Sequence, residues 1–151
     1  MQICQDDLTG QKIIELLEEH LRNMHEITPP ESIHALDLSR LRVPSISFWS
    51  IWDGDELLGC GALKELDTRS GEVKSMRTRT IHRGRGVASR MLEHIIGEAQ
   101  KRSYTHLFLE TGAFPEFEPA RALYSKYGFE YQGPFGDYKD DPNSVFMAKK
   151  L

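Results

Sequence analysis

The first apolar residues of the chain recur three and four positions apart, which is the spacing of one face of an α-helix. They are Ile13, Ile14, Leu16, Leu17, Leu21 and Met24. This pattern predicts a helix over roughly residues 10–25, preceded by a short strand at residues 2–4. Pro29-Pro30 ends the helical region, and a second, short helix is expected over residues 31–41.

The segments that follow have the apolar and polar pattern of strands. Residues 46–52 and 57–66 are predicted to form a hairpin across the turn Asp53-Gly54-Asp55. A further strand is predicted over residues 72–78. The middle of the chain is therefore expected to be a run of three strands.

Gly84 and Gly86 introduce the clearest amphipathic helix, because the apolar residues after them fall on one face. These residues are Val87, Met91, Leu92, Ile95, Ile96 and Ala99. Residues 105–111 are predicted to form a strand in which Phe108 and Glu110 share one side.

A last helix is expected around Pro119, because the first turn of a helix tolerates proline, and Gly128 can end it in the left-handed conformation. Its apolar face carries Ala120, Leu123, Tyr124 and Tyr127. Strands are expected near residues 129–133 and 144–149. This order predicts an α/β fold, with a mixed central sheet, helices on both faces and one central βαβ unit, in a single domain over residues 1–151.

The net charge of −4 argues against a general nucleic-acid binder, but the distribution of charge is uneven. Residues 73–92 contain no Asp or Glu. The basic residues in this window are Lys74, Arg77, Arg79, Arg83, Arg85 and Arg90. An acid-free, arginine-rich segment in an acidic protein indicates an anionic ligand, and a solvated basic face is the alternative.

Several classes of protein are excluded by what the sequence lacks. The longest apolar stretch, residues 57–63, contains two glycines and is too short to span a bilayer. No secretory signal is expected at the N-terminus, and Cys4 and Cys60 suit a reducing compartment, so a cytoplasmic location is predicted. The histidines show no zinc spacing, so no metal is expected. A homodimer is compatible with the sequence, which does not decide the oligomeric state.

The most informative segment is Arg83-Gly84-Arg85-Gly86-Val87-Ala88, between a predicted strand and a predicted helix. Its glycines allow a ligand to approach the backbone closely. The start of the following helix offers unpaired N–H groups and the positive end of the helix dipole. Together these features predict an anion site suited to a pyrophosphate, and a glycine-rich turn without a ligand is the alternative.

Two ligands compete for this loop. Gly84-x-Gly86-x-x-Ser89, with Glu110 after the next strand, nearly matches the dinucleotide fingerprint. However, the third glycine is missing, Thr80-Ile81-His82 separates the loop from its strand, and residues 72–78 are too polar for a doubly buried strand. Coenzyme A, which carries a pyrophosphate and a ribose phosphate, fits better.

The sequence resembles the GCN5-related N-acetyltransferase superfamily, and within it the small bacterial type. Arg83 to Ala88 matches its Arg/Gln-x-x-Gly-x-Gly/Ala signature, and Ala120 to Phe129 matches its Ala-x-x-x-Tyr-x-x-x-Gly-Phe segment. The resemblance covers essentially the whole chain and is specific from Glu72 onward. It implies an acetyl-CoA-dependent enzyme that acetylates an amine directly, in a ternary complex. A non-catalytic acyl-CoA-binding module and a nicotinamide dinucleotide-binding domain are the alternatives.

The resemblance also implies a layout for acetyl-CoA. The backbone of Met76, Arg77 and Thr78 would pair with the pantetheine arm, as a strand adds to a sheet edge. The pyrophosphate would lie on Arg83, Gly84, Arg85, Gly86, Val87, Ala88 and Ser89. The helix that carries Ala120 and Tyr124 would flank the thioester. Many members have an Asn where this chain has Phe117, so a contact with acetyl-CoA there is lost or replaced.

Amide formation from a thioester needs a neutral amine, and the departing thiolate leaves better if it receives a proton. Tyr124 is the candidate proton donor, because the resemblance puts it beside the sulfur, and a packing tyrosine is the alternative. Glu110 is the candidate base by similarity to ribosomal-protein alanine acetyltransferases. Glu72 or a chain of waters could replace it, and a solvated or ion-paired carboxylate is the alternative for both glutamates.

The resemblance places the acceptor between residues 24–37 and 132–144. These segments contain His25, Glu31, Ser32, His34, Asp37, Asp137, Tyr138, Asp140 and Asp141, with Lys139 as the counter-charge. Clustered carboxylates attract a cation. The acceptor is therefore predicted to be a small cationic amine or a peptide N-terminus, and not a nucleic acid. Ordinary solvated loop residues are the alternative.

Overall fold

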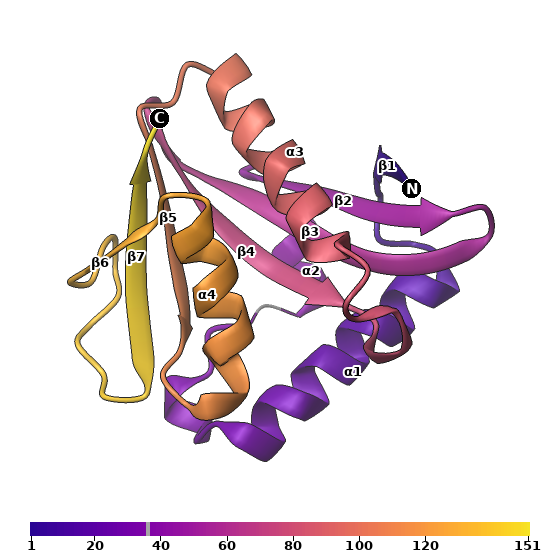
Figure 1. Ribbon diagram of the computed structural model, residues 1–151, viewed down its shortest axis with the longest axis horizontal. Coiled ribbons are helices and arrows are strands. Elements are labelled where there is room, and N and C mark those ends of the chain that lie inside the picture. The colour runs from indigo at the N-terminus through magenta and orange to yellow at the C-terminus, as the bar shows by residue number, and fades with distance from the viewer. Residues whose placement is uncertain (36) are drawn as a thin grey trace.

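The computed structural model describes residues 1–35 and 37–151, whose strands form one seven-stranded mixed sheet (Figure 1). Along the sheet the strands lie in the order β1 (Gln2–Gln5), β2 (Ile46–Asp53), β3 (Glu56–Asp67), β4 (Ser70–Thr78), β5 (His106–Gly112), β7 (Ser144–Lys150) and β6 (Glu130–Gln132). The helices are α1 (Gln11–Ile27), α2 (Leu38–Leu41), α3 (Val87–Lys101) and α4 (Glu118–Lys126). Short 3₁₀ turns occur at η1 (Pro30–Ser32), η2 (Thr80–His82) and η3 (Pro115–Phe117).

The helices cover both faces of the sheet, as predicted for the α/β class. On one face, α3 and α4 pack through Met91, Leu92 and Tyr124 against strand residues that include Leu107 and Leu109. On the other face, the apolar stripe of α1 packs against β2 and β3 in a second core cluster. This cluster contains Ile13, Leu16, Leu17, Phe48, Leu57 and Ala62. The 3.6-residue period of the helices and the two-residue period of the strands thus account for the two cores.

β4, α3 and β5 form the predicted βαβ unit, since β4 and β5 are parallel neighbours. Within the described chain these two strands pair only over Ser70–Glu72 and His106–Phe108. Beyond this short contact they diverge, and Figure 1 shows β4 and β5 running apart while α1 crosses near their far ends. The sheet is therefore split, and the β5-facing edge of β4 is open beyond Glu72.

A β-bulge in β4 accompanies the split. Ser75 has a left-handed φ of 53°, which is uncommon for a residue with a side chain. The pairing of β3 with β4 shifts register between Cys60 and Ala62, opposite the same segment. A bulge of this kind bends its strand and increases the local twist. It therefore helps β4 to turn away from β5.

The prediction of one helix over residues 31–41 is wrong. The structure has a 3₁₀ turn at η1 and a separate, one-turn α2, and position 36 of the predicted helix lies outside the described residues. Ile33 is extended, and the Asp37 carboxylate accepts a hydrogen bond from the Arg40 N–H at 3.0 Å. Asp37 is thus an N-cap that begins a new helix, and continuation of a helix from residue 31 is prevented.

The other predicted elements are confirmed to within a few residues. Gly128 has a φ of 91° directly after α4, and the Phe129 N–H donates to the Tyr124 carbonyl at 3.1 Å, so the glycine ends that helix as expected.

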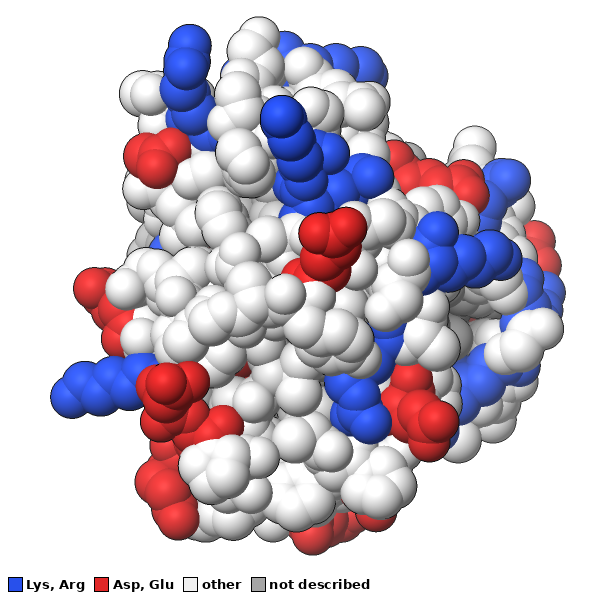
Figure 2. Space-filling model, turned by 60° about the vertical axis from the view of Figure 1, so that its left-hand side comes forward, with Lys and Arg blue, Asp and Glu red and all other residues white. Residues whose placement is uncertain are grey.

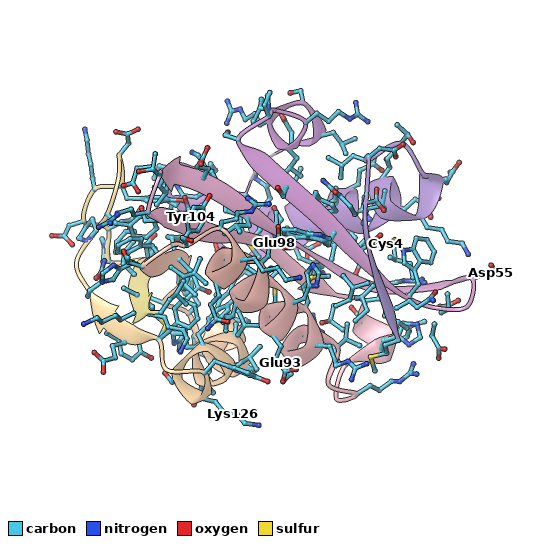
Figure 3. The ribbon with its side chains drawn as sticks, turned by 90° about the horizontal axis from the view of Figure 1, so that it is seen from above. Cys4, Asp55, Glu93, Glu98, Tyr104 and Lys126 are labelled. Carbon is cyan, nitrogen blue, oxygen red and sulfur yellow. The ribbon has the colours of Figure 1, made fainter. Side chains whose placement is uncertain are left out.

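Seen from above in Figure 3, Asp55 lies at the tip of the β2–β3 hairpin, far from Lys126 at the end of α4. Among the described helices, none has the length and apolar character that crossing a membrane requires.

Candidate active site

The glycine-rich loop forms an open turn in front of α3. Gly84 and Gly86 both have a φ of 79°, a conformation that side chains rarely adopt. Among the described residues, no neighbouring atom lies within 4 Å of the Cβ that either glycine would carry. Gly86 is the N-cap of α3 and offers it no side-chain hydrogen bond. The helix therefore presents its first N–H groups to an open space that suits a phosphate group.

The basic side chains around this loop do not all serve the same purpose. The Arg85 guanidinium lies 2.7 Å from His82 Nδ1, and His82 Nε2 lies 2.9 Å from the Glu56 carboxylate. A neutral imidazole with its proton on Nε2 satisfies both neighbours. Arg77 pairs with Glu19 of α1 at 3.0 Å. Arg85 and Arg77 thus also tie the loop and β4 to other elements, whereas Arg83 is exposed.

The segment Met76-Arg77-Thr78 lies on β4 beyond the point at which β4 and β5 diverge. Its side chains are anchored elsewhere: the sulfur of Met76 packs close to Gly61, and Arg77 reaches α1. The backbone of this segment borders the open side of the split sheet. An extended ligand can therefore add to it by backbone hydrogen bonds, as a further strand would.

A small inner pocket of about 140 Å³ lies at the split. Its lining includes six of the residues predicted for the site, which come from β4, β5, η3 and α4: Glu72, Met76, Glu110, Phe117, Ala120 and Tyr124. The structure thus gathers the predicted catalytic residues in one place. The lining also includes His20 and Met24 of α1, Thr28 directly after α1, and Asn143. Of these, His20 lies outside every segment that the sequence analysis placed at the site.

Phe117 forms part of the apolar wall of this inner pocket. Its ring packs so closely on Gly112 that a methyl group on that glycine would overlap it. The Arg121 guanidinium holds the same loop by donating to the carbonyls of Gly112 (2.7 Å) and Phe114 (3.0 Å). Phe117 therefore gives the pocket a fixed aromatic wall at this position.

An outer cleft of about 1060 Å³ adjoins the inner pocket. Glu72 and His34 line both cavities, so the two meet at these side chains. The floor of the outer cleft includes Phe108 of β5 and Phe135 of the β6–β7 connection, whose rings stack with centroids 5.0 Å apart. The Ser32 hydroxyl donates to Asp141 at 2.6 Å, which ties η1 to the β6–β7 connection.

The predicted acceptor segments do meet at this outer cleft. Its lining includes Glu31, His34, Asp137, Tyr138, Lys139, Asp140 and Asp141, whereas His25, Ser32 and Asp37 are not part of it. The β3–β4 hairpin adds Lys64, Glu65, Asp67 and Arg69, which the sequence analysis did not anticipate. On the face shown in Figure 2, acidic and basic side chains are interspersed around a largely uncharged middle. Within residues 1–35 and 37–151, no cluster of His, Cys, Asp and Glu could hold a metal ion.

Comparison with known proteins decides the family. Residues 10–129 match the Acetyltransferase (GNAT) family. The chain belongs to this family. YsnE, an uncharacterised N-acetyltransferase of Bacillus subtilis, is 62% identical over 151 residues, which are 100% of both chains. The IAA acetyltransferase of Azospirillum brasilense is 40% identical over 141 residues, covering 92% of this chain and 90% of that protein.

Solved structures agree on the fold. A GNAT family acetyltransferase from Elizabethkingia anophelis, crystallised with acetyl-CoA bound, matches with a TM-score of 0.70. The match covers 99% of this chain and 97% of that one at 18% identity. The chain is thus an acyltransferase of the GNAT family.

The phenol of Tyr124 in this GNAT enzyme is held in its neutral form. The side chain is buried, with 7% of its surface exposed, and its ring meets Phe129 edge-on at 5.8 Å. Burial, and then the nearby charge of Glu110, raise the pKa of Tyr124 well above its ordinary value. The group therefore carries a proton at neutral pH, and it is a weaker acid than a solvent-exposed phenol.

The two candidate bases have different surroundings. Burial raises the pKa of Glu110 to about 7, opposed in part by the Ser144 hydroxyl and the charge of Lys74. A carboxyl with this pKa exchanges protons readily near neutral pH. Glu72 is instead engaged by neighbours: the Lys74 ammonium lies 3.1 Å and the Tyr138 hydroxyl 2.6 Å from its Oε2. Of the two, Glu110 is better suited to accept a proton.

The raised pKa of Glu110 gives a test by stability. Folding raises the carboxyl pKa from 4.5 to about 7, so the native state binds more protons than the unfolded state between these values. The wild type should therefore lose stability as pH rises from about 4.5 to 7, relative to Glu110→Gln, which cannot ionise. Across this window, the free energy of unfolding of Glu110→Gln should rise relative to that of the wild type by up to a few kcal/mol. Above the window, the difference between the two should stay constant.

Urea unfolding at a series of pH values measures this difference. Glu130→Gln, at an exposed position on β6, is the matched control for removal of a glutamate charge. Parallel pH profiles for the wild type and Glu110→Gln would show that burial does not perturb Glu110.

Proposed function

We propose that this enzyme transfers the acetyl group of acetyl-CoA directly to a small cationic amine or a peptide N-terminus. One observation carries the proposal: the split between β4 and β5 brings Tyr124 and Glu110 into one pocket that opens onto a cleft with acidic residues. The relative crystallised with acetyl-CoA bound supports the donor.

The chain's own residues suit acetyl-CoA as co-substrate. The loop from Arg83 to Ser89 offers open backbone and the start of α3 to a pyrophosphate. The open edge of β4 at Met76 to Thr78 offers hydrogen-bonding groups to the amide-containing arm. The thioester would then lie in the inner pocket beside Tyr124. Phe117 gives that pocket an apolar wall.

The proposed transfer needs one group that accepts a proton and one that gives a proton. The acceptor arrives as an ammonium ion, because an ordinary amine has a pKa of about 10.4. It loses one proton to the Glu110 carboxylate. The nitrogen attacks the thioester carbon, the C–S bond breaks, and Tyr124 gives its proton to the departing sulfur. The second proton on nitrogen restores the Tyr124 phenol, and Glu110 releases its proton to solvent. The products are the acetylated amine and coenzyme A with a free thiol.

The acidic residues of the outer cleft should raise the local concentration of a cationic acceptor. Changing Asp137, Asp140 and Asp141 together to Asn is therefore expected to raise the acceptor KM on the order of tenfold at low salt. The effect should shrink as salt is added, because screening weakens these fields. Release of free thiol from acetyl-CoA, measured over a panel of amines and peptides, gives the KM values.

Two controls make this test specific. Glu15, Glu18 and Glu26 are exposed on α1 and are absent from both cavities, so changing them to Gln removes the same charge elsewhere. Asp141 also holds Ser32 and the Asn143 N–H, so Asp137 and Asp140 are also changed without it. A triple variant that keeps its KM and its salt dependence would show that the acidic rim is ordinary surface.

The acceptor panel should also contain IAA, the acceptor in the name of the Azospirillum brasilense relative. If IAA supports thiol release and none of the amines in the panel does, the proposed acceptor class is refuted.

The location is proposed to be the cytoplasm, since Cys4 is free and exposed and Cys60 is free and buried. Burial also raises the pKa of Cys60 to about 12, so its thiol is an unreactive core group.

A further inference from the structure

Tyr138 occupies the junction between the inner pocket and the outer cleft. It lies on the connection between β6 and β7, and its hydroxyl donates to Glu72 Oε2 at 2.6 Å. The Lys74 ammonium donates to the same Tyr138 oxygen at 3.0 Å and to the same Glu72 oxygen at 3.1 Å. The three side chains thus form a closed triangle across β4 and the β6–β7 connection.

The ring of Tyr138 is held separately from its hydroxyl. It meets the ring of His34 edge-on at 4.9 Å and that of Phe135 at 5.0 Å, and it is tilted against Phe146 at 5.5 Å. These contacts involve only the aromatic ring. Removal of the hydroxyl alone should therefore leave the packing of the β6–β7 connection intact.

Glu72 is the group that an entering amine would meet. Its side chain is 3% exposed, and it lines both cavities, whereas Tyr138 lines the outer one. A buried carboxylate needs hydrogen-bond donors, and Lys74 and Tyr138 supply them in the absence of an acceptor. An ammonium ion is a stronger donor to a carboxylate than a neutral phenol is. The phenol therefore fills a position that a cationic amine can take over.

We propose that Tyr138 is a specificity gate: the ammonium group of the acceptor displaces its hydroxyl from Glu72 on the way from the outer cleft to the inner pocket. This inference rests on the proposed function. It selects cationic acceptors, because a neutral amide or alcohol gains too little at Glu72 to replace the phenol. At the junction, the charges of Asp141 and Glu72 oppose that of Lys74 in their effect on the pKa of His34, which burial lowers.

The gate predicts an effect opposite to that of an ordinary substrate-binding tyrosine. Tyr138→Phe removes the competing hydroxyl and keeps the ring, so a cationic acceptor should bind about three- to tenfold more tightly, as expected for loss of one hydrogen bond. Binding of butylammonium to the full chain in the presence of coenzyme A, measured by calorimetry, tests this without turnover. Butanol, which is neutral, should show no such gain.

A second pair of variants separates a gate from a structural role. In a Glu72→Gln background the carboxylate is absent, so Tyr138→Phe should no longer tighten butylammonium binding, and the two changes should be strongly non-additive. Tyr131→Phe, on β6 and exposed, is the matched control and should change nothing. Additive changes, or a gain that persists without Glu72, would overturn the gate.

The failure of the gate and the failure of the proposed function give different results. Weaker or unchanged butylammonium binding by Tyr138→Phe, in an enzyme whose wild type releases thiol with amines, refutes the gate alone. A wild type that releases no thiol with any amine refutes the amine acceptor class, and the gate fails with it.

Discussion

Gly86→Glu is expected to abolish acetyl-CoA binding. In the wild type, acetyl-CoA at a hundredfold excess over its dissociation constant should add about 2.7 kcal/mol to the free energy of unfolding. The Glu side chain would enter the open space in front of α3, where no described atom lies within 4 Å of the Cβ position. Its negative charge would then occupy the site proposed for the pyrophosphate, and the stabilisation should vanish.

The control for this substitution must separate loss of the ligand site from strain in the backbone. A side chain at a φ of 79° is strained whatever the space around it, so Gly86→Glu should also lower the basal stability by about 1 kcal/mol. Gly136 has a φ of 56° and open surroundings on the β6–β7 connection, where it lines the outer cleft and not the glycine-rich loop. Gly136→Glu should therefore show similar strain and keep the stabilisation by acetyl-CoA.

Thermal unfolding with and without acetyl-CoA measures both variants. Coenzyme A should stabilise the wild type as acetyl-CoA does, because both carry the pyrophosphate. If Gly86→Glu were still stabilised by either compound to the same extent as the wild type, the ligand would lie elsewhere on the protein.

The parts of the site that could be predicted are those encoded by local sequence. The glycines before α3 predict the start of a helix with free N–H groups. The Ala120 to Phe129 segment contains both the amphipathic face of a helix and the glycine that ends it. The two-residue period of β5 placed Glu110 and Phe108 on the side away from the α3 core, and both line cavities there. Each of these signals lies within about ten residues of the group it positions.

The parts that could not be predicted depend on contacts between distant segments. The hydrogen bond between Tyr138 and Glu72 joins residues 66 positions apart, and nothing near either residue signals the other. The bulge at Ser75 has no glycine to indicate its left-handed backbone. His20 is on α1, yet it reaches the inner pocket because α1 crosses the open end of the split sheet. These features are consequences of tertiary packing.

The error over residues 31–41 has a more local origin. The sequence analysis expected one short helix after Pro29-Pro30, but the Asp37 side chain competes for the backbone N–H of Arg40 and starts a new turn. The consequence reaches the site, because His34 and Ser32 lie in the non-helical part and contact the β6–β7 connection. A continuous helix would carry these side chains in other directions.

Tyr124→Phe is expected to lower the rate of acetyl transfer by about a hundred- to ten-thousandfold, the usual contribution of a single general acid. The affinity for acetyl-CoA should stay nearly unchanged, since the Phe ring keeps the edge-on contact with Phe129. A single-turnover assay isolates the chemical step from product release. The loss should therefore appear in the turnover rate and not in the dissociation constant.

Tyr127→Phe on the same helix end is the matched control, because the Tyr127 hydroxyl donates to Glu93 of α3 at 2.5 Å, away from the inner pocket. It removes one phenolic hydroxyl and should leave the chemical step unchanged. Acyl donors with a better leaving group provide a further test. A thioester whose thiol is more acidic needs less help from an acid, so the deficit of Tyr124→Phe should shrink with it. If the single-turnover rate of Tyr124→Phe equals that of the wild type, Tyr124 only packs against Phe129, and the thiolate leaves without a proton from the protein.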